Sequence, residues 1–133
     1  AYEPTNNRSE LKKTERNELI IDAYNANPTS MKAALDNFRL MPANHKMAIL
    51  GEMRELGDAS PEEHRHVVEL VGKAGCEEVW LVGDNFRPFA GTYRVFDNVE
   101  AVRKHLEDHP VSGRLILIKG SNGTRLFRLP ELL

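Results

Sequence analysis

Four short, continuously apolar segments constrain the fold of this chain more than any other feature of its sequence. They are Leu19–Ile21, Met47–Leu50, Val79–Val82 and Leu115–Ile118, and each is followed at once by a polar residue or a glycine. Consecutive apolar side chains require both faces of a strand to be covered, which is typical of a parallel sheet between two layers of helices. A shorter run at Tyr93–Phe96 predicts an additional edge strand.

Three segments between these strands carry helix start signals and apolar residues at helical spacing. Asn27 precedes the first, Ser60 and Glu63 predict a capping box at the second, and Asp97 with Glu100 repeats that pattern at the third. The alternation of strands and helices predicts an α/β fold, a three-layer sandwich with a mainly parallel sheet.

The chain has 133 residues, which is enough for one core and favours a single domain. Residues 1–18 lack the strand and helix pattern, so we interpret them as a lead-in segment or linker before a domain at 19–133. The chain begins with Ala1 instead of Met, which indicates processing or a piece of a longer protein. At the other end, Leu126–Leu133 favours a short helix that Pro130 limits.

Composition excludes several classes of function. The 18 Lys and Arg residues against 20 Asp and Glu give a formal charge of -2, so no positive field exists to attract nucleic acid or an anionic membrane. Cys76 is the single cysteine, which excludes an internal disulfide and fits the cytosol. No apolar run reaches the roughly 20 residues that cross a bilayer. The five histidines are not spaced as a metal site.

The polar residues that follow the apolar segments are the candidate site. They occupy 22–27, 51–55, 83–87 and 119–123, and ligands of open α/β sheets bind outside the carboxyl ends of the strands. Lys119 is expected to reach out of a buried strand end, where Gly120–Gly123 would form an anion-binding nest beside it. Asn27 has a simpler interpretation as a helix N-cap, and Gly51, Gly83 and Gly120 as residues that let the backbone turn.

Several catalytic motifs are missing from the sequence. There is no phosphate-binding P-loop, no dinucleotide G-x-G-x-x-G after the first strand, and no nucleophile beside a recognisable base. By itself the chain has binding groups without a complete catalytic apparatus.

Four stretches together resemble one family. Asp22–Met31 reads D-A-Y-N-A-N-P-T-S-M, Leu50–Gly57 reads L-G-E-M-R-E-L-G with Ser60 and His64 beyond it, and Ile118–Ser121 reads I-K-G-S. With Asn7–Glu10, these are similar to the C-terminal domain of the Mur ligase family, in the branch that adds D-alanyl-D-alanine to UDP-N-acetylmuramoyl-tripeptide. The resemblance covers nearly the whole chain.

The resemblance implies a Rossmann-like domain of an ATP-dependent peptide ligase that works in peptidoglycan precursor synthesis. In that family a central ATPase domain carries the P-loop and supplies most of the contacts to ATP and Mg²⁺. Residues 1–18 would lead in from that central domain. The tripeptide carboxylate becomes an acyl phosphate, which the amine of D-alanyl-D-alanine attacks. The domain alone is expected to be inactive, and the ligase to be a cytoplasmic monomer that binds neither nucleic acid nor membrane.

The resemblance also assigns residues. Arg8 and Asp22 would contact ATP, while Tyr24, Asn25 and Asn27 would lie on the substrate side. Lys119 and Ser121 would bind an anionic group of the dipeptide or the nucleotide. Asn122 stands where an Arg is common after K-G-S, so the group that binds the dipeptide carboxylate is open. Arg87 is a candidate, since a sister ligase uses an Arg in a similar loop.

Two other interpretations stay open at this point. The chain fits a non-enzymatic α/β module that binds a nucleotide or a phosphorylated metabolite at the same strand ends. It also fits a sister ligase domain with another amino acid as substrate.

Overall fold

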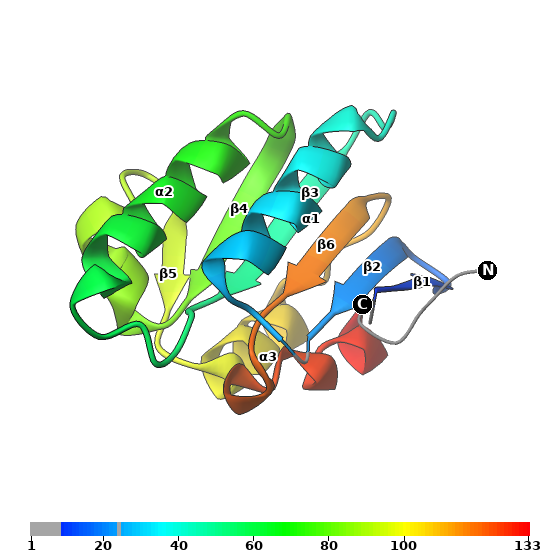
Figure 1. Cartoon of the computed structure of the whole chain (residues 1–133). Helices are drawn as coiled ribbons and strands as arrows, with labels where there is room; N and C mark the ends of the chain where they lie inside the picture. Colours follow the sequence, from blue (N-terminus) through cyan, green and yellow to red (C-terminus); the bar gives the residue numbers. More distant parts are fainter. Residues whose placement is uncertain (1–8, 24) are drawn as a thin grey trace.

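The computed structural model describes residues 9–23 and 25–133, which form an α/β sandwich around one six-stranded sheet (Figure 1). The sheet order is β1-β2-β6-β3-β4-β5, and every neighbouring pair from β2 to β5 is parallel. The strands are β1 (Glu10–Lys13), β2 (Glu18–Asp22), β3 (Lys46–Gly51), β4 (Cys76–Val82), β5 (Arg94–Phe96) and β6 (Leu115–Lys119). The four predicted parallel strands and the predicted edge strand are all confirmed.

The first strand lies within residues 1–18, which we interpret from the sequence as a lead-in segment or linker. β1 pairs antiparallel with β2, with Glu10 opposite Ile21 and Lys13 opposite Glu18. All four β1 residues are exposed, so the segment shows no apolar pattern that sequence reasoning detects. The sheet therefore begins at residue 10, before the boundary expected at residue 19.

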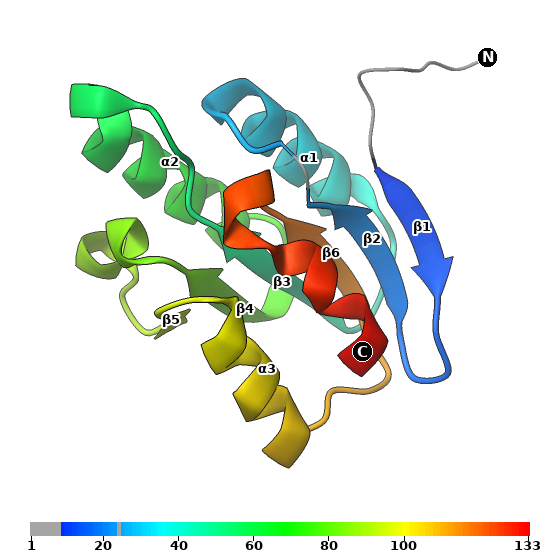
Figure 2. The ribbon, with the colours of Figure 1, turned by 90° about the horizontal axis from the view of Figure 1, so that it is seen from below.

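Helices cover both faces of the sheet, as Figure 2 shows from below. α1 (Pro28–Leu40) and α2 (Ser60–Gly72) lie on one face, and α3 (Val99–Asp108) lies on the other. Successive residues of one strand enter different cores: Ile49 packs on the α3 side, whereas Leu50 packs with α1 and α2. This two-sided burial explains why the strand segments are continuously apolar.

The helix starts differ from two of the three expectations. Asn27 caps α1, with its Oδ1 accepting the Ser30 N–H at 2.8 Å, as predicted. Ser60 is instead the first residue of α2, because the 3₁₀ turn η1 (Gly57–Ala59) continues directly into the helix and leaves no extended cap position. Asn98, and not Asp97, caps α3 by accepting the Ala101 N–H at 2.9 Å.

The end of the chain forms three short 3₁₀ turns where one short helix was expected. They are η3 (Asn122–Thr124), η4 (Leu126–Arg128) and η5 (Pro130–Leu132). Leu126, Leu129 and Leu133 pack into the α3-side core, so this segment closes that face of the sheet beside α3 (Figure 2).

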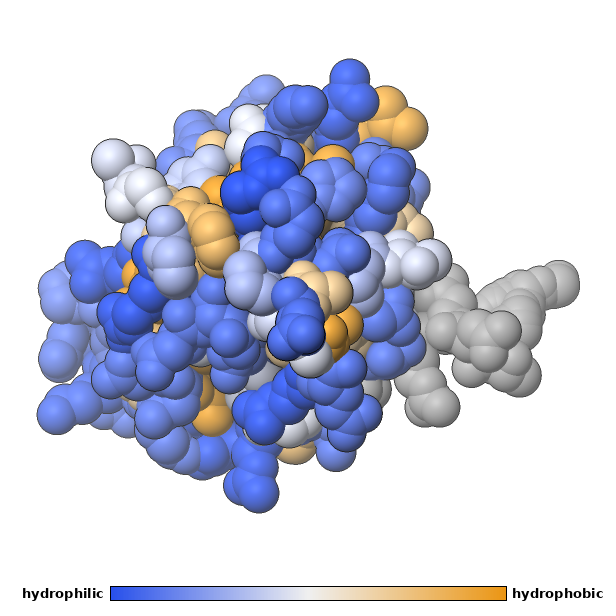
Figure 3. Space-filling model, turned by 60° about the vertical axis from the view of Figure 1, so that its left-hand side comes forward, coloured by the Kyte–Doolittle hydropathy of each residue, from blue (hydrophilic) through white to orange (hydrophobic). Residues whose placement is uncertain are grey.

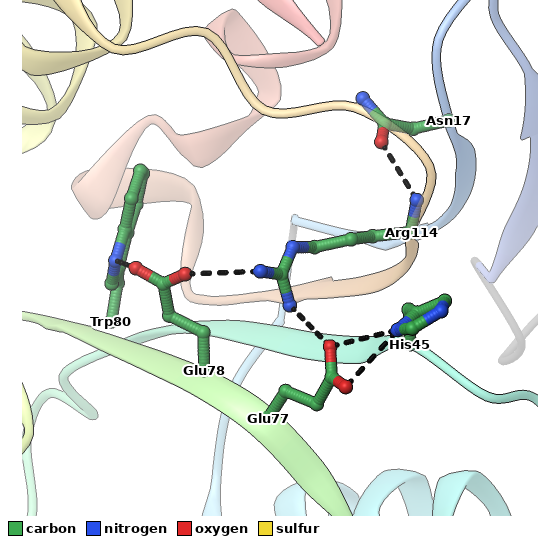
Figure 4. A network of polar contacts seen from close by, with 6 residues as sticks. All are labelled: Asn17, His45, Glu77, Glu78, Trp80 and Arg114. Atoms are coloured by element: carbon green, nitrogen blue, oxygen red, sulfur yellow. Dashed lines mark hydrogen bonds and ion pairs between the residues drawn. The ribbon is translucent and has the colours of Figure 1, made fainter.

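A polar network holds the amino ends of the central strands together (Figure 4). The Arg114 guanidinium contacts Glu77 at 3.1 Å and Glu78 at 3.5 Å, and Glu78 accepts the Trp80 indole N–H at 2.7 Å. Asn17 is buried and accepts the Arg114 backbone N–H at 3.1 Å. A wide surface hollow of about 580 Å³ also lies at this end, away from the residues that follow the strands.

The outer surface is mostly hydrophilic on the side shown in Figure 3, with small and separate apolar patches. The large hydrophobic side chains that stay exposed among the described residues are Leu11, Leu40 and Phe127. No helix in the described part of the chain combines the length and apolar character needed to span a membrane.

Candidate functional site at the strand ends

The carboxyl ends of five strands lie at one edge of the sheet. Asp22 at the end of β2 is in register with Lys119 at the end of β6, and Lys119 is in register with Leu50 of β3. Val82 of β4 pairs with Gly51 on one side and Phe96 of β5 on the other. The loops that carry the predicted site residues therefore emerge side by side.

Lys119 joins the two predicted residues of the β2 loop. Its ammonium lies 2.9 Å from Asp22 Oδ2 and donates to the Asn25 carbonyl oxygen at 2.6 Å. The expectation that Asp22, Asn25 and Lys119 converge is confirmed. The expectation that Lys119 reaches outward is wrong, because its side chain is 1% exposed and its charge is balanced inside the protein.

Asp22 retains binding capacity in this arrangement. Its side chain is 15% exposed, and its Oδ2 takes the contacts from Lys119 and, at 3.4 Å, Ser9. The other oxygen, Oδ1, has no hydrogen-bond partner among residues 9–23 and 25–133. One carboxylate oxygen at the rim is thus available to a ligand hydroxyl.

The remaining predicted residues of the first loop divide into three cases. Asn27 uses its side chain for the α1 cap, and Ser30 Oγ accepts the Asn27 backbone N–H at 3.0 Å in return. The Asn25 side chain is exposed beside the Lys119 ion pair. Arg8 and Tyr24 lie outside the described residues.

The loop after β6 packs tightly over the strand ends. A Cβ at Gly120 would lie 2.6 Å from Thr124 Oγ1, and one at Gly51 would lie 2.8 Å from the same atom. These two glycines are thus explained by close approach and not by turning, whereas Gly83 has the left-handed φ of +119°. Ser121 Oγ is buried there, and it has no hydrogen-bond partner in the described part of the chain.

Arg87 lies at the other side of the edge, in the 3₁₀ segment η2 (Asp84–Phe89) after β4. Its Nε donates to Asp84 at 2.7 Å, and its Nη2 contacts Asp97. The hydrogen bond to Asp84, and then the charges of Asp84 and Asp97, raise the pKa of Arg87. We call Lys119, Asp22 and Asn25 the Lys119 cluster. In the sheet order β6 and β3 separate β4 from β2, so Arg87, which follows β4, does not join this cluster.

A cavity of about 230 Å³ opens between the loops after β3, β4 and β6 and the start of α3. Six ionisable residues are among its lining: Glu52, Arg54, Asp97, Glu100, Arg125 and Arg128. Three are acidic and three are basic, so the lining is balanced in charge. Sequence reasoning did not identify Arg125 as a cavity residue. Arg125 belongs to no recognisable motif, and its left-handed φ of 57° is not one that an arginine predicts from sequence.

Polar contacts of the lining residues shape this cavity, and one of them is the Arg54–Glu52 ion pair at 4.0 Å. Glu52 Oε1 accepts from Asn85 Nδ2 at 2.8 Å and from the Asn85 backbone N–H at 3.2 Å, which ties the β3 loop to the β4 loop. Arg128 pairs with Glu100, the second residue of α3. Arg125 has no ion-pair partner among the described residues, so its guanidinium is available to an anion.

The described residues include no cluster of three or more His, Cys, Asp or Glu side chains that would hold a metal ion. The site combines a buried ion pair, a cavity lined by three acidic and three basic residues, and an Asp22 oxygen that has no hydrogen-bond partner in the described part of the chain.

Comparison with known proteins gives a family match and a similar curated protein. Residues 7–122 match the family model "Mur ligase, glutamate ligase domain". The chain is 38% identical over 133 residues to the UDP-N-acetylmuramoyl-tripeptide--D-alanyl-D-alanine ligase of Rickettsia prowazekii, covering 96% of this chain and 30% of that protein.

Solved structures agree with that match. A MurF crystal structure from Acinetobacter baumannii superposes with a TM-score of 0.76 at 27% identity, covering 96% of this chain and 29% of the other. A MurF ligase from Thermotoga maritima in complex with ADP gives 0.75 at 23% identity, covering 92% and 29%, which bears on the fold alone. The chain thus spans less than a third of the length of these proteins.

Proposed function

The chain belongs to the Mur ligase family through its glutamate ligase domain, and from this we propose that it is one domain of an ATP-dependent peptide ligase. The proposed reaction joins D-alanyl-D-alanine to UDP-N-acetylmuramoyl-tripeptide during peptidoglycan precursor synthesis. The observation that carries the proposal is the 38% identity to a ligase of that name over 96% of this chain.

The balanced cavity supports a place for the incoming dipeptide. D-alanyl-D-alanine is a zwitterion at neutral pH, and a cavity of about 230 Å³ with three acidic and three basic lining residues matches its size class and both charges. In the proposed arrangement Arg125 binds the carboxylate, since it is the cavity arginine without an ion-pair partner among the described residues. Glu52 then faces the ammonium end.

This arrangement revises the proposal for the carboxylate binder. Arg87 was the candidate from the sequence, but its guanidinium is already shared between Asp84 and Asp97. A dipeptide carboxylate would have to displace one of those carboxylates, whereas Arg125 requires no exchange. Arg87 then acts as a brace between η2 and the residue before the Asn98 cap.

The Lys119 cluster supports a place for the nucleotide. The free Oδ1 of Asp22 suits a ribose hydroxyl, and Arg8 is proposed to reach the phosphates. Lys119, whose charge Asp22 balances, would fix the orientation of Asp22, and Ser121 Oγ, which has no hydrogen-bond partner among the described residues, is proposed to contact an anionic group. Asn25, Asn27 and Tyr24 stay proposed contacts on the substrate side.

The reaction that this domain would serve is amide formation from an acyl phosphate, with loss of phosphate after attack by the dipeptide amine. The ammonium that Glu52 binds must lose one proton before the neutral amine can attack, and we propose the Glu52 carboxylate as the acceptor of that proton. Mg²⁺ would neutralise charge on the phosphoryl oxygens. We propose that Mg²⁺ is bound mainly by the central ATPase domain of the same ligase. That domain is the proposed partner of this chain, and the cytoplasm is the proposed location of the ligase.

A ligation assay on the complete protein tests this function. The protein is mixed with ATP, Mg²⁺, UDP-N-acetylmuramoyl-tripeptide and one acceptor from a panel of single amino acids and dipeptides, and phosphate release and product mass are followed. We expect product with D-alanyl-D-alanine. Product with a single amino acid alone would show a sister ligase, and nucleotide binding without any product would show a non-enzymatic module.

A further inference from the structure

His64 is buried inside the molecule, whereas His45, His66 and His109 are exposed and His105 is half-buried. It is on α2, its side chain is 0% exposed, and its ring packs edge-on to Phe86 with a centroid distance of 4.8 Å. We infer that His64 is a positioning residue for the candidate site, acting through the backbone of the β3 loop. This inference rests on the proposed function.

The hydrogen bonds of the ring define one tautomer. The Met53 backbone N–H donates to Nε2 at 2.9 Å, so Nε2 carries no proton. Nδ1 then carries the proton and donates to the Ser60 carbonyl oxygen at 2.8 Å, one turn back on α2. The ring is thereby a rigid link from the first turn of α2 to the peptide group before Met53.

That peptide group stands between two lining residues of the cavity. Glu52 and Arg54 flank Met53, and Met53 itself is buried at 1% exposure. Glu55, two residues further on, has a left-handed φ of 63°, a conformation that a residue other than glycine keeps only where neighbouring contacts enforce it. The His64 hydrogen bond fixes the backbone at Met53 in this segment, and from this we argue that it helps to set where the neighbouring Glu52 and Arg54 project.

His64 also contacts the second loop of the cavity. Phe86, against which the ring packs, belongs to η2 after β4, next to Asn85. Asn85 in turn binds Glu52 with both its side-chain and backbone nitrogens. His64 therefore contacts the residue next to each partner of the Glu52–Asn85 contact. It accepts a hydrogen bond from Met53, which follows Glu52, and it packs on Phe86, which follows Asn85.

A matched pair of substitutions isolates the hydrogen bond. His64→Gln places an amide oxygen near the position of Nε2 and keeps an acceptor for the Met53 N–H, whereas His64→Met has similar volume and no comparable acceptor. Val71→Ala on the same helix, at a buried position away from the loop, controls for loss of stability alone.

The variants are measured in the complete protein that contains this chain. We expect His64→Met to raise the KM for D-alanyl-D-alanine about tenfold, the factor that one lost hydrogen bond commonly gives, with the KM for ATP unchanged. His64→Gln should stay within about twofold of the wild type, and Val71→Ala should leave both KM values unchanged. Equal KM values in all three variants would overturn the inference.

Amide hydrogen exchange gives a second readout that needs no activity. The peptide spanning residues 51–56 should exchange at least about tenfold faster in His64→Met, and at the wild-type rate in His64→Gln. If the wild-type protein forms no ligation product, the proposed function fails and the exchange result still decides whether His64 positions the loop. Unchanged exchange in His64→Met would overturn the inference in either case.

Discussion

The Lys119–Asp22 ion pair gives the sharpest stability prediction. Lys119 is 1% exposed and the Asp22 side chain 15% exposed, so removing one partner leaves the other largely out of water. Breaking a buried pair in this way costs about 3–5 kcal/mol, and we expect the lower end, about 3 kcal/mol, for Asp22→Asn because the rim admits some water. Lys119→Met should cost less than Asp22→Asn, since the Asp22 carboxylate left behind is nearer to solvent.

Urea unfolding of the chain, followed by circular dichroism, measures these values. A loss of about 3 kcal/mol corresponds to a midpoint lowered by about 1–3 M urea at the usual slopes. The control is Lys32→Met, which removes an exposed ion pair with Asp36 at 2.6 Å and should change stability by less than about 0.5 kcal/mol.

The double variant Asp22→Asn with Lys119→Met completes a mutant cycle. Because neither charge is left unpaired, it should cost less than the sum of the two single variants, by about 1–3 kcal/mol. Single variants as stable as Lys32→Met, or strictly additive losses, would refute the view that this pair joins the ends of β2 and β6.

Three further predictions concern other parts of the fold. Gly120→Ala should destabilise the chain by about 1–3 kcal/mol in the same urea assay, because the added Cβ meets Thr124 Oγ1 at 2.6 Å; wild-type stability would show that η3 is free to move away. Burial raises the pKa of the Cys76 thiol to about 11, so alkylation by iodoacetamide should stay slow at pH 8 to 9 and accelerate towards pH 11. Because the folded chain holds that proton longer than the unfolded chain, Cys76 should also make stability fall as pH rises from 9 towards 11; fast labelling at neutral pH would contradict this. Desolvation, with the charges of Arg94 and His109, lowers the pKa of His105, so its NMR titration should lie below the ordinary histidine value, and stability from this group should be lost as pH falls below that ordinary value.

The sheet could be predicted because its four central strands contain runs of consecutive apolar residues. Four buried runs and their order specify a parallel sheet with helices on both faces, and the convergence of Asp22, Asn25 and Lys119 follows from that topology. β1 could not be predicted in this way. All its side chains are exposed, so its pairing depends on backbone hydrogen bonds to β2, which leave no hydrophobic pattern.

Local chemistry was less predictable where tertiary contacts decide. Ser60 has the sequence of a cap, yet the preceding 3₁₀ turn places it inside the helix, where its carbonyl oxygen serves His64 instead. Lys119 has the sequence of an exposed cation at a strand end, but Asp22 from another strand turns it inward. The Lys119 outcome depends on a residue 97 positions away in sequence, whereas the Ser60 outcome depends on the turn directly before it.

The most direct measurement is an NMR titration of this chain with D-alanyl-D-alanine. We predict weak binding, because the proposed function assigns part of the pocket to the rest of the ligase, with shifts at the amides of residues 52–54 and 120–125. The amides of Asn17 and Arg114, in the network at the opposite end of the strands (Figure 4), should not move. Shifts confined to that opposite end, or none at the carboxyl ends at millimolar dipeptide, would contradict the placement of the acceptor site.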